Sequence, residues 1–317
     1  MRTALEGIHL EDAGIVRVSG VDAVKFLQGQ LSNDVSKLSA QQSLLAGYHN
    51  PQGRTIALLR LVQWNTDDIL AVLPRELAAV VTARLAKYVL RAKVKIVDES
   101  AQWRIVGLVG AQAQGDGAVF VRVGDQPPRW LAISPVDAAT HAGAESRADG
   151  MFPLLDYTPI DRATWRRLEV ASGQPQVYAA TSEEFVAQML NLDALNAIAF
   201  DKGCYTGQEV IARAHYRGRV KRRMQRFVSR QPLQLAPGDA GEFADGRSFK
   251  VVSSAPLEDG RCDFLAVTSV VSGSAAGGAG DVAAAGGAGA APVGSGATPG
   301  VAIVDAEQVA LPYALPE

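Results

Sequence analysis

The residue types that could do chemistry gather in one segment, residues 201–224, whose sequence is DKGCYTGQEVIARAHYRGRVKRRM. Cys204 lies between Gly203 and Gly207, and Lys202 precedes it by two positions. A nearby cation or the amino end of a helix favours the thiolate, which is the nucleophilic and metal-binding form of cysteine. The spacing makes Cys204 and Lys202 candidate catalytic residues. An inert cysteine in a turn is the alternative.

The second half of this segment alternates in charge. Six of its seven basic residues fall on odd numbers: Arg213, His215, Arg217, Arg219, Lys221 and Arg223. Alternate side chains of an extended strand face one side, so the pattern predicts a basic stripe. Such a stripe suits a polyanion, for example an RNA backbone, a glutamate tail or an acidic partner surface. A strand edge kept basic to block edge pairing is the alternative.

The remaining composition excludes several classes of protein. The chain has two cysteines, 58 residues apart, which rules out a four-cysteine metal site. Cys262 is interpreted as a structural residue. His9, His49 and His141 share no ligand spacing, so no metal site is predicted. A net charge of −2 and a pI near 6.1 argue against binding nucleic acid through bulk charge.

The sequence shows no targeting or membrane segment. Its start lacks a basic stretch followed by an apolar one, and no run of 18 apolar residues occurs. These features predict a cytoplasmic protein with reduced thiols.

The elements that must position these residues are of mixed type. Strands are expected at 44–49 and 55–64 around a turn at 50–53, and helices at 162–172, opened by Asp161, and at 182–195. From residue 225 onward strands dominate, as in a small β-barrel. Residues 272–300 hold 10 Gly and 10 Ala and are expected to form a flexible insertion. The pattern indicates an α+β fold with mainly antiparallel sheets.

A resemblance extends these inferences. The octapeptide KGCYTGQE at 202–209 resembles the signature of the YgfZ family, the folate-binding relatives of the glycine-cleavage aminomethyltransferase. Further similar segments follow in family order at residues 26–35, 52–54, 191–195, 210–213, 216–218 and 311–313. The resemblance therefore covers most of the chain.

The resemblance implies a fold and a domain layout. The fold would be aminomethyltransferase-like, with two interleaved ferredoxin-like α+β units around a central cleft and a C-terminal β-barrel. The first unit would comprise residues 1–49 with 151–224, and the second residues 50–150. The β-barrel would comprise residues 225–317, including the insertion.

The resemblance also implies a function. The family supports the assembly or repair of iron–sulfur enzymes, including the tRNA methylthiotransferase, and acts as an accessory protein rather than an independent catalyst. Trp165 matches a tryptophan that packs on the cofactor, tetrahydrofolate or another folate. Arg213, Arg217 or Arg219 would bind the glutamate tail of the folate. Cys204 would serve as a transient ligand or redox thiol.

Two other interpretations stay open. One is a tetrahydrofolate-dependent aminomethyl transferase, whose chemistry requires a placed carboxylate. The other is an RNA-binding module, disfavoured by the acidic pI, so direct nucleic-acid binding is not expected.

Aminomethyltransferases hold the pterin with a glutamate where this chain has Ala171. Glu169 lies about 200° around the helix from that position, so the cleft is predicted to lack this carboxylate.

Overall fold

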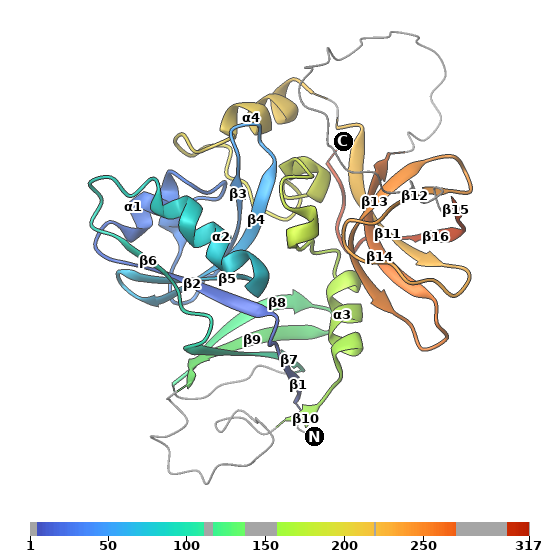
Figure 1. The fold of residues 1–317 in the computed structure, drawn as a ribbon, viewed down its shortest axis with the longest axis horizontal. Coiled ribbons are helices and arrows are strands. Elements are labelled where there is room, and N and C mark those ends of the chain that lie inside the picture. The colour runs from blue at the N-terminus through green and yellow to red at the C-terminus, as the bar shows by residue number, and fades with distance from the viewer. Residues whose placement is uncertain (1–4, 111–116, 137–156, 219, 271–302, 317) are drawn as a thin grey trace, which may run out of the picture.

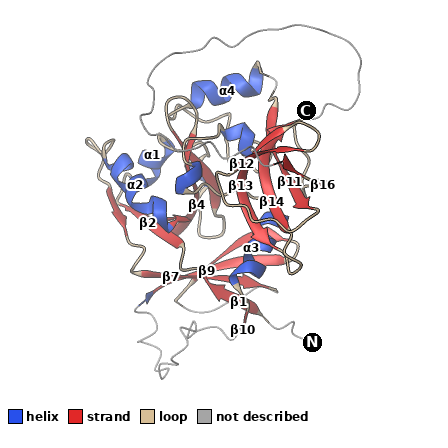
Figure 2. Ribbon diagram, turned by 45° about the vertical axis from the view of Figure 1, so that its right-hand side comes forward, coloured by secondary structure: helices blue, strands red, loops and turns tan. Residues whose placement is uncertain are grey.

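The computed structural model describes residues 5–110, 117–136, 157–218, 220–270 and 303–316, which form three β-sheets with a few short helices (Figure 1). Strands dominate, and the few helices are short (Figure 2). The predicted flexible insertion at 272–300 falls outside the described residues. Among the described residues, no helix is long and apolar enough to span a membrane.

The first sheet has the strand order β3-β4-β5-β2-β6, and all its pairings are antiparallel. Its strands are β2 (Ala13–Ser19), β3 (Leu44–His49), β4 (Thr55–Asn65), β5 (Asp68–Pro74) and β6 (Lys95–Asp98). Helices α1 (Ala23–Gln28) and α2 (Arg75–Ala86) accompany it. Leu77, Val81 and Leu85 repeat at helical spacing and are buried, so one face of α2 packs on the core.

The second sheet has the order β10-β1-β7-β9-β8. Its strands are β1 (Glu6–His9), β7 (Trp103–Val109), β8 (Val119–Asp125), β9 (Pro128–Pro135) and β10 (Thr158–Pro159). Helix α3 (Arg162–Ala171) follows, and Asp161 caps it by accepting a hydrogen bond from the Thr164 amide, as expected. The chain turns away at Gly173, whose φ of +65° favours glycine.

The third sheet has the order β15-β12-β13-β14-β11-β16 and is nearly closed, like a barrel (Figure 1). Its strands are β11 (Arg222–Ser229), β12 (Ala240–Phe243), β13 (Ser248–Pro256), β14 (Cys262–Ser269), β15 (Ile303–Val304) and β16 (Ala306–Val309). Four phenylalanines fill its interior: Phe227, Phe243, Phe249 and Phe264. The prediction of a terminal barrel-like domain in an α+β protein is confirmed.

The predicted helix over 182–195 is wrong. Glu183 has a φ of +64°, its amide donates to the Thr55 carbonyl, and the Thr55 amide donates to the Phe185 carbonyl. The backbone at residues 183–185 thus pairs with the first residue of β4. Within 182–195 the structure forms only a short 3₁₀ turn, η4 (Ala187–Leu190). Long-range pairing replaces the local helical bonds that the acidic start suggested.

The predicted extended basic stripe is also wrong. Residues Gln208–Tyr216 form helix α4, so Arg213 and His215 do not line one face of a strand. The run of Gln, Glu and Ala favours a helix, and buried Ile211 anchors it. Arg223 lies in β11 and forms a buried ion pair with Asp193, 2.8 Å between Nη2 and Oδ2. The basic residues of this segment are therefore divided between helix α4 and the buried ion pair of β11.

Sheet membership cuts across the expected domain limits. β3 and β4 pair with each other, so the first sheet takes strands from both sides of the expected limit at residue 49. The second sheet likewise joins β1 to β7, which lie about 100 residues apart in the chain. The three sheets are the structural units on which the candidate site depends.

Candidate functional site

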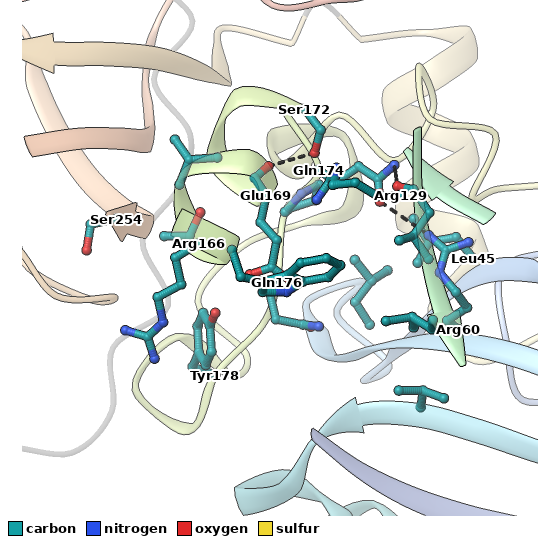
Figure 3. A pocket seen from close by; sticks show the side chains of 18 residues that line it. Leu45, Arg60, Arg129, Arg166, Glu169, Ser172, Gln174, Gln176, Tyr178 and Ser254 are labelled. Atoms are coloured by element: carbon teal, nitrogen blue, oxygen red, sulfur yellow. Dashed lines mark hydrogen bonds between the residues drawn. The ribbon is translucent and has the colours of Figure 1, made fainter. Parts of the chain in front are cut away.

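A cavity of about 110 Å³ lies where the three sheets and α3 meet (Figure 3). The first sheet contributes Leu58 and Arg60 from β4, and the second contributes Arg129 from β9. Ser253 and Ser254 come from β13 of the third sheet. Because each sheet supplies part of the wall, the cavity exists only when all three are assembled.

Arg129 is the most buried charge in this wall, with 2% of its surface exposed. Its guanidinium lies over the ring of Trp165, 5.6 Å from the ring centroid. A Cβ on Gly124 would come within 2.7 Å of two guanidinium nitrogens, so glycine makes room for this side chain. Burial lowers the pKa of Arg129. No described residue forms an ion pair or hydrogen bond with its guanidinium, which leaves its donors available to a ligand.

Glu169 faces the same cavity from α3 (Figure 3). Burial raises the pKa of its carboxyl, and the charge of Arg129 opposes that rise. Glu169 thus lines the cavity although it lies about 200° around the helix from position 171. Glu169 and Ser172, three positions apart, share the helix face that lines the cavity, whereas Ala171 does not line it.

Arg60 of β4 adds a second cation on the same side of the cavity as Arg129 (Figure 3). Its Nη2 donates to the Gln174 side-chain oxygen at 3.3 Å, and the Gln174 amide donates to the Val123 carbonyl at 3.0 Å. Burial lowers the pKa of Arg60 to about 10. The sequence analysis missed this residue. A lone arginine within the apolar strand TIALLRLV at 55–62 was the signal that could have found it.

Trp165 forms the aromatic wall and is 1% exposed. A Cβ on Gly107 would come within 2.7–2.8 Å of three ring carbons, so strand β7 approaches the indole closely. The ring is therefore held between β7 and the guanidinium of Arg129. Of the predicted site residues that the structure describes, Trp165 alone lines the cavity.

An outer hollow of about 360 Å³ adjoins the cavity and shares Arg166, Tyr178 and Ser254 with it. Glu76 lines its far side. Arg166 at the junction lies 3.6 Å from the exposed carboxylate of Asp12. A ligand can therefore place one end in the cavity and extend past a cation into the hollow.

The signature segment lies outside the lining of both hollows. Lys202 donates to the carbonyls of Leu31 at 2.7 Å and Asn33 at 2.6 Å, and lies 5.2 Å from the ring centroid of Tyr205. Burial lowers the pKa of Lys202 to about 8. The amine thus fastens the signature loop to the chain that follows α1. Cys204, two residues on, is exposed.

Helix α4 begins at Gln208, four residues after Cys204. Gly207 precedes it with a φ of +81°, and a Cβ there would come within 2.6 Å of the Asn50 carbonyl oxygen. The signature glycine therefore allows the loop to pack on the turn between β3 and β4.

The three arginines expected at a folate tail lie apart from the cavity. Arg213 on α4 and Arg217 at its end are exposed and line neither hollow, and α4 lies at the margin of the molecule (Figure 1). Arg219 falls outside the described residues. Their role, like those of Lys202 and Cys204, stays a prediction. Within the part of the chain that the structure describes, no group of three or more His, Cys, Asp and Glu could hold a metal ion.

The architecture is that of the aminomethyltransferase fold. The solved structure of the glycine cleavage system aminomethyltransferase T from Bartonella henselae matches it with a TM-score of 0.66, covering 84% of this chain and 79% of that one. Sequence identity is 14%, so this likeness shows the fold alone. No family model matches the sequence.

Curated relatives define the family more closely. The tRNA-modifying protein YgfZ of Edwardsiella ictaluri is 34% identical over 284 residues, covering 83% of this chain and 84% of the relative. The protein of the same name from Enterobacter sp. is 30% identical over 285 residues, covering 82% and 84%. The chain belongs to the YgfZ family, which confirms the family inferred from the signature octapeptide.

Proposed function

We propose that the central cavity binds a folate, tetrahydrofolate in particular, and that the protein is an accessory factor for iron–sulfur enzymes, including ones that modify tRNA. The observation that carries the proposal is the buried Arg129 guanidinium, which faces the cavity opposite Glu169 without an ion pair to it. The name of the relatives supports the link to tRNA modification.

The chemistry of the cavity wall fits a pterin. A pterin edge presents N–H donors beside a carbonyl acceptor. A carboxylate such as Glu169 accepts from the donors, and the guanidinium of Arg129 donates to the acceptor. Trp165 supplies an aromatic wall. The benzoyl-glutamate part of the folate would extend into the outer hollow past Arg166, which offers a cation to its carboxylates.

The thiols support the accessory role. Cys204 is exposed and Cys262 is buried, so one chain offers a single accessible thiol. An iron–sulfur cluster is commonly held by four cysteines, so contact between a cluster and Cys204 requires ligands from a client protein. The folate would then bind in the central cavity, and the exposed thiol would act from the signature loop, which does not line that cavity.

Calorimetric titration with tetrahydrofolate tests the folate site. We expect the parent protein to bind, and Arg129→Gln and Glu169→Gln each to bind about 10- to 100-fold more weakly, because each loses one charge-assisted hydrogen bond. Arg122→Gln is the matched control. Arg122 lies on β8 of the same sheet and is exposed, with an ion pair to Asp125. A parent protein that does not bind tetrahydrofolate overturns the proposal.

One observation favours a second function. Glu169 places a carboxylate on the cavity wall, and aminomethyl transfer to tetrahydrofolate would require such a group. A glycine-cleavage assay with the lipoyl partner protein distinguishes this enzyme from an accessory factor. Turnover by the parent and its loss in Glu169→Gln would favour the transferase. Folate binding without turnover would favour the accessory role.

A further inference from the structure

A separate hollow of about 250 Å³ lies where β1, β7 and α2 meet, and shares no lining residue with the central cavity. Three basic side chains from three elements line it: His9 of β1, Arg104 of β7 and Arg75 of α2. None of them belongs to the signature segment or to the proposed folate site.

The fold sets the spacing of these side chains. His9 pairs with Val106, so Arg104, two residues along β7, is its diagonal neighbour on the same sheet face. Arg75 starts α2, and its amide donates to the Asp12 carbonyl at 2.8 Å. A Cβ on Gly14 would come within 2.9 Å of the Arg75 Cα, so glycine allows the helix to approach this closely.

The two arginines have no counter-charge of their own. Among the described residues, none forms an ion pair or hydrogen bond with the guanidinium of Arg75 or of Arg104. The carboxylate of Asp12 is engaged by Arg162 and Arg166. Glu76, beside Arg75, accepts a hydrogen bond from the Ala179 amide and lines the outer hollow instead.

The pKa of His9 depends on the charges around this hollow. Burial lowers its pKa, and Arg104, Arg162 and Arg75 lower it further. Glu11 alone opposes them; its carboxylate is 3.8 Å from Nδ1 and is 80% exposed. Glu11 also lines the hollow, so two arginines face one exposed carboxylate there, and the hollow has a net positive charge and is open to an anion.

We propose that this hollow binds a phosphoryl group. Guanidinium groups present paired N–H donors that match two oxygens of a phosphate, and two such groups face one hollow here. The volume admits a phosphate together with the first part of its substituent. The phosphate would come from a free phosphorylated small molecule or from the phosphodiester backbone of a nucleic acid.

Titration with inorganic pyrophosphate tests the proposal. The imidazole signal of His9, assigned with a His9→Gln variant, is followed by NMR as a function of pH. We expect pyrophosphate to raise the pKa of His9 by about one unit, because an added anion favours the imidazolium. We expect the double variant Arg75→Gln/Arg104→Gln to bind pyrophosphate at least about tenfold more weakly.

The control removes two arginines elsewhere, as Arg230→Gln/Arg261→Gln. Arg230 follows β11 and Arg261 precedes β14, and each pairs with an aspartate. Equal binding by the control and the site variant, or no response of His9 in the parent, overturns the proposal. Circular dichroism confirms that both variants fold. If Arg75→Gln/Arg104→Gln does not fold, the single variant Arg75→Gln, at an exposed position, replaces it.

A second probe distinguishes the source of the phosphate. A short oligonucleotide without terminal phosphates carries phosphodiesters only. Its binding, weakened in the site variant but not in the control, would indicate a nucleic-acid backbone. Binding of pyrophosphate but not of the oligonucleotide would indicate a free phosphorylated molecule. Tetrahydrofolate affinity should be unchanged in the site variant, which separates this proposal from the folate site.

Discussion

His49 offers a quantitative test of how deeply the core beneath the signature loop is buried. It lies on β3 with 1% of its surface exposed, and neither ring nitrogen has a hydrogen-bond partner among the described residues. Its ring covers Gly47, and its Cβ lies 3.2 Å from where a Cβ on Gly207 would be. Burial lowers the pKa of His49 from 6.5 to about 3.

The sign and size of the effect on stability follow from proton linkage. Because the folded pKa is the lower one, the unfolded chain binds the extra proton, and stability present above pH 6.5 is lost as the pH falls toward 3. With these two pKa values, His49 removes about 2 kcal/mol from the free energy of unfolding at pH 5 but only about 0.2 kcal/mol at pH 7.

Denaturant unfolding at pH 7 and pH 5 measures this contribution. We expect the parent to lose about 2 kcal/mol more stability than His49→Gln between these pH values, whatever the absolute stability of the variant. The carboxyl of Asp34, whose pKa is lowered to about 2 mainly by a hydrogen bond from Ser36, is present in both proteins and cancels from the comparison.

His215→Gln serves as the control for losing an imidazole, because His215 is exposed and stacks on Phe200 at 3.8 Å between ring centroids. The reasoning is refuted if His49→Gln and the parent lose the same stability between pH 7 and pH 5. That result would mean that His49 is hydrated or paired in the folded protein.

Three further predictions concern other parts of the structure. Gly107→Ala should displace Trp165 at the central cavity, lower the free energy of unfolding by about 1–3 kcal/mol and weaken the proposed binding of tetrahydrofolate; an unchanged free energy of unfolding and an unchanged calorimetric affinity would contradict the close packing. Arg223→Met leaves the carboxylate of Asp193 buried without its partner, so the free energy of unfolding should fall by about 3–5 kcal/mol, measured with urea. Iodoacetamide at pH 8 should label Cys204 alone in the folded protein, because Cys262 is 2% exposed and burial raises its pKa to about 11; two labels by mass spectrometry would contradict this.

Local signals in the sequence predicted many elements well. The strand expected at 44–49 has those bounds, and the helix opened by Asp161 begins at Arg162 and ends one residue before its expected end. Caps, turn glycines and apolar periodicity act within a few residues, so they can be recognised without the fold. The signature octapeptide identified the family for the same reason, since its residues are contiguous.

The candidate site was less predictable. Trp165 was found through the resemblance, but Arg60, Arg129 and Glu169 were not singled out as lining residues. Each comes from a different element, and their sequence positions are separated by about 40 to 70 residues. A charge becomes part of a buried site only when distant segments remove its water and withhold a counter-charge.

The sequence by itself determined the α+β class, the barrel-like end of the chain and the membership of the YgfZ family. Only the tertiary structure decided which charged residues face a common space. Arg223, which the odd-numbered pattern placed on a surface stripe, is buried against Asp193. Arg75 and Arg104, which no pattern distinguished, line a hollow without a partner among the described residues. The physical reason is that hydrogen bonding and apolar periodicity act locally, whereas desolvation and charge pairing depend on segments that meet only in the folded protein.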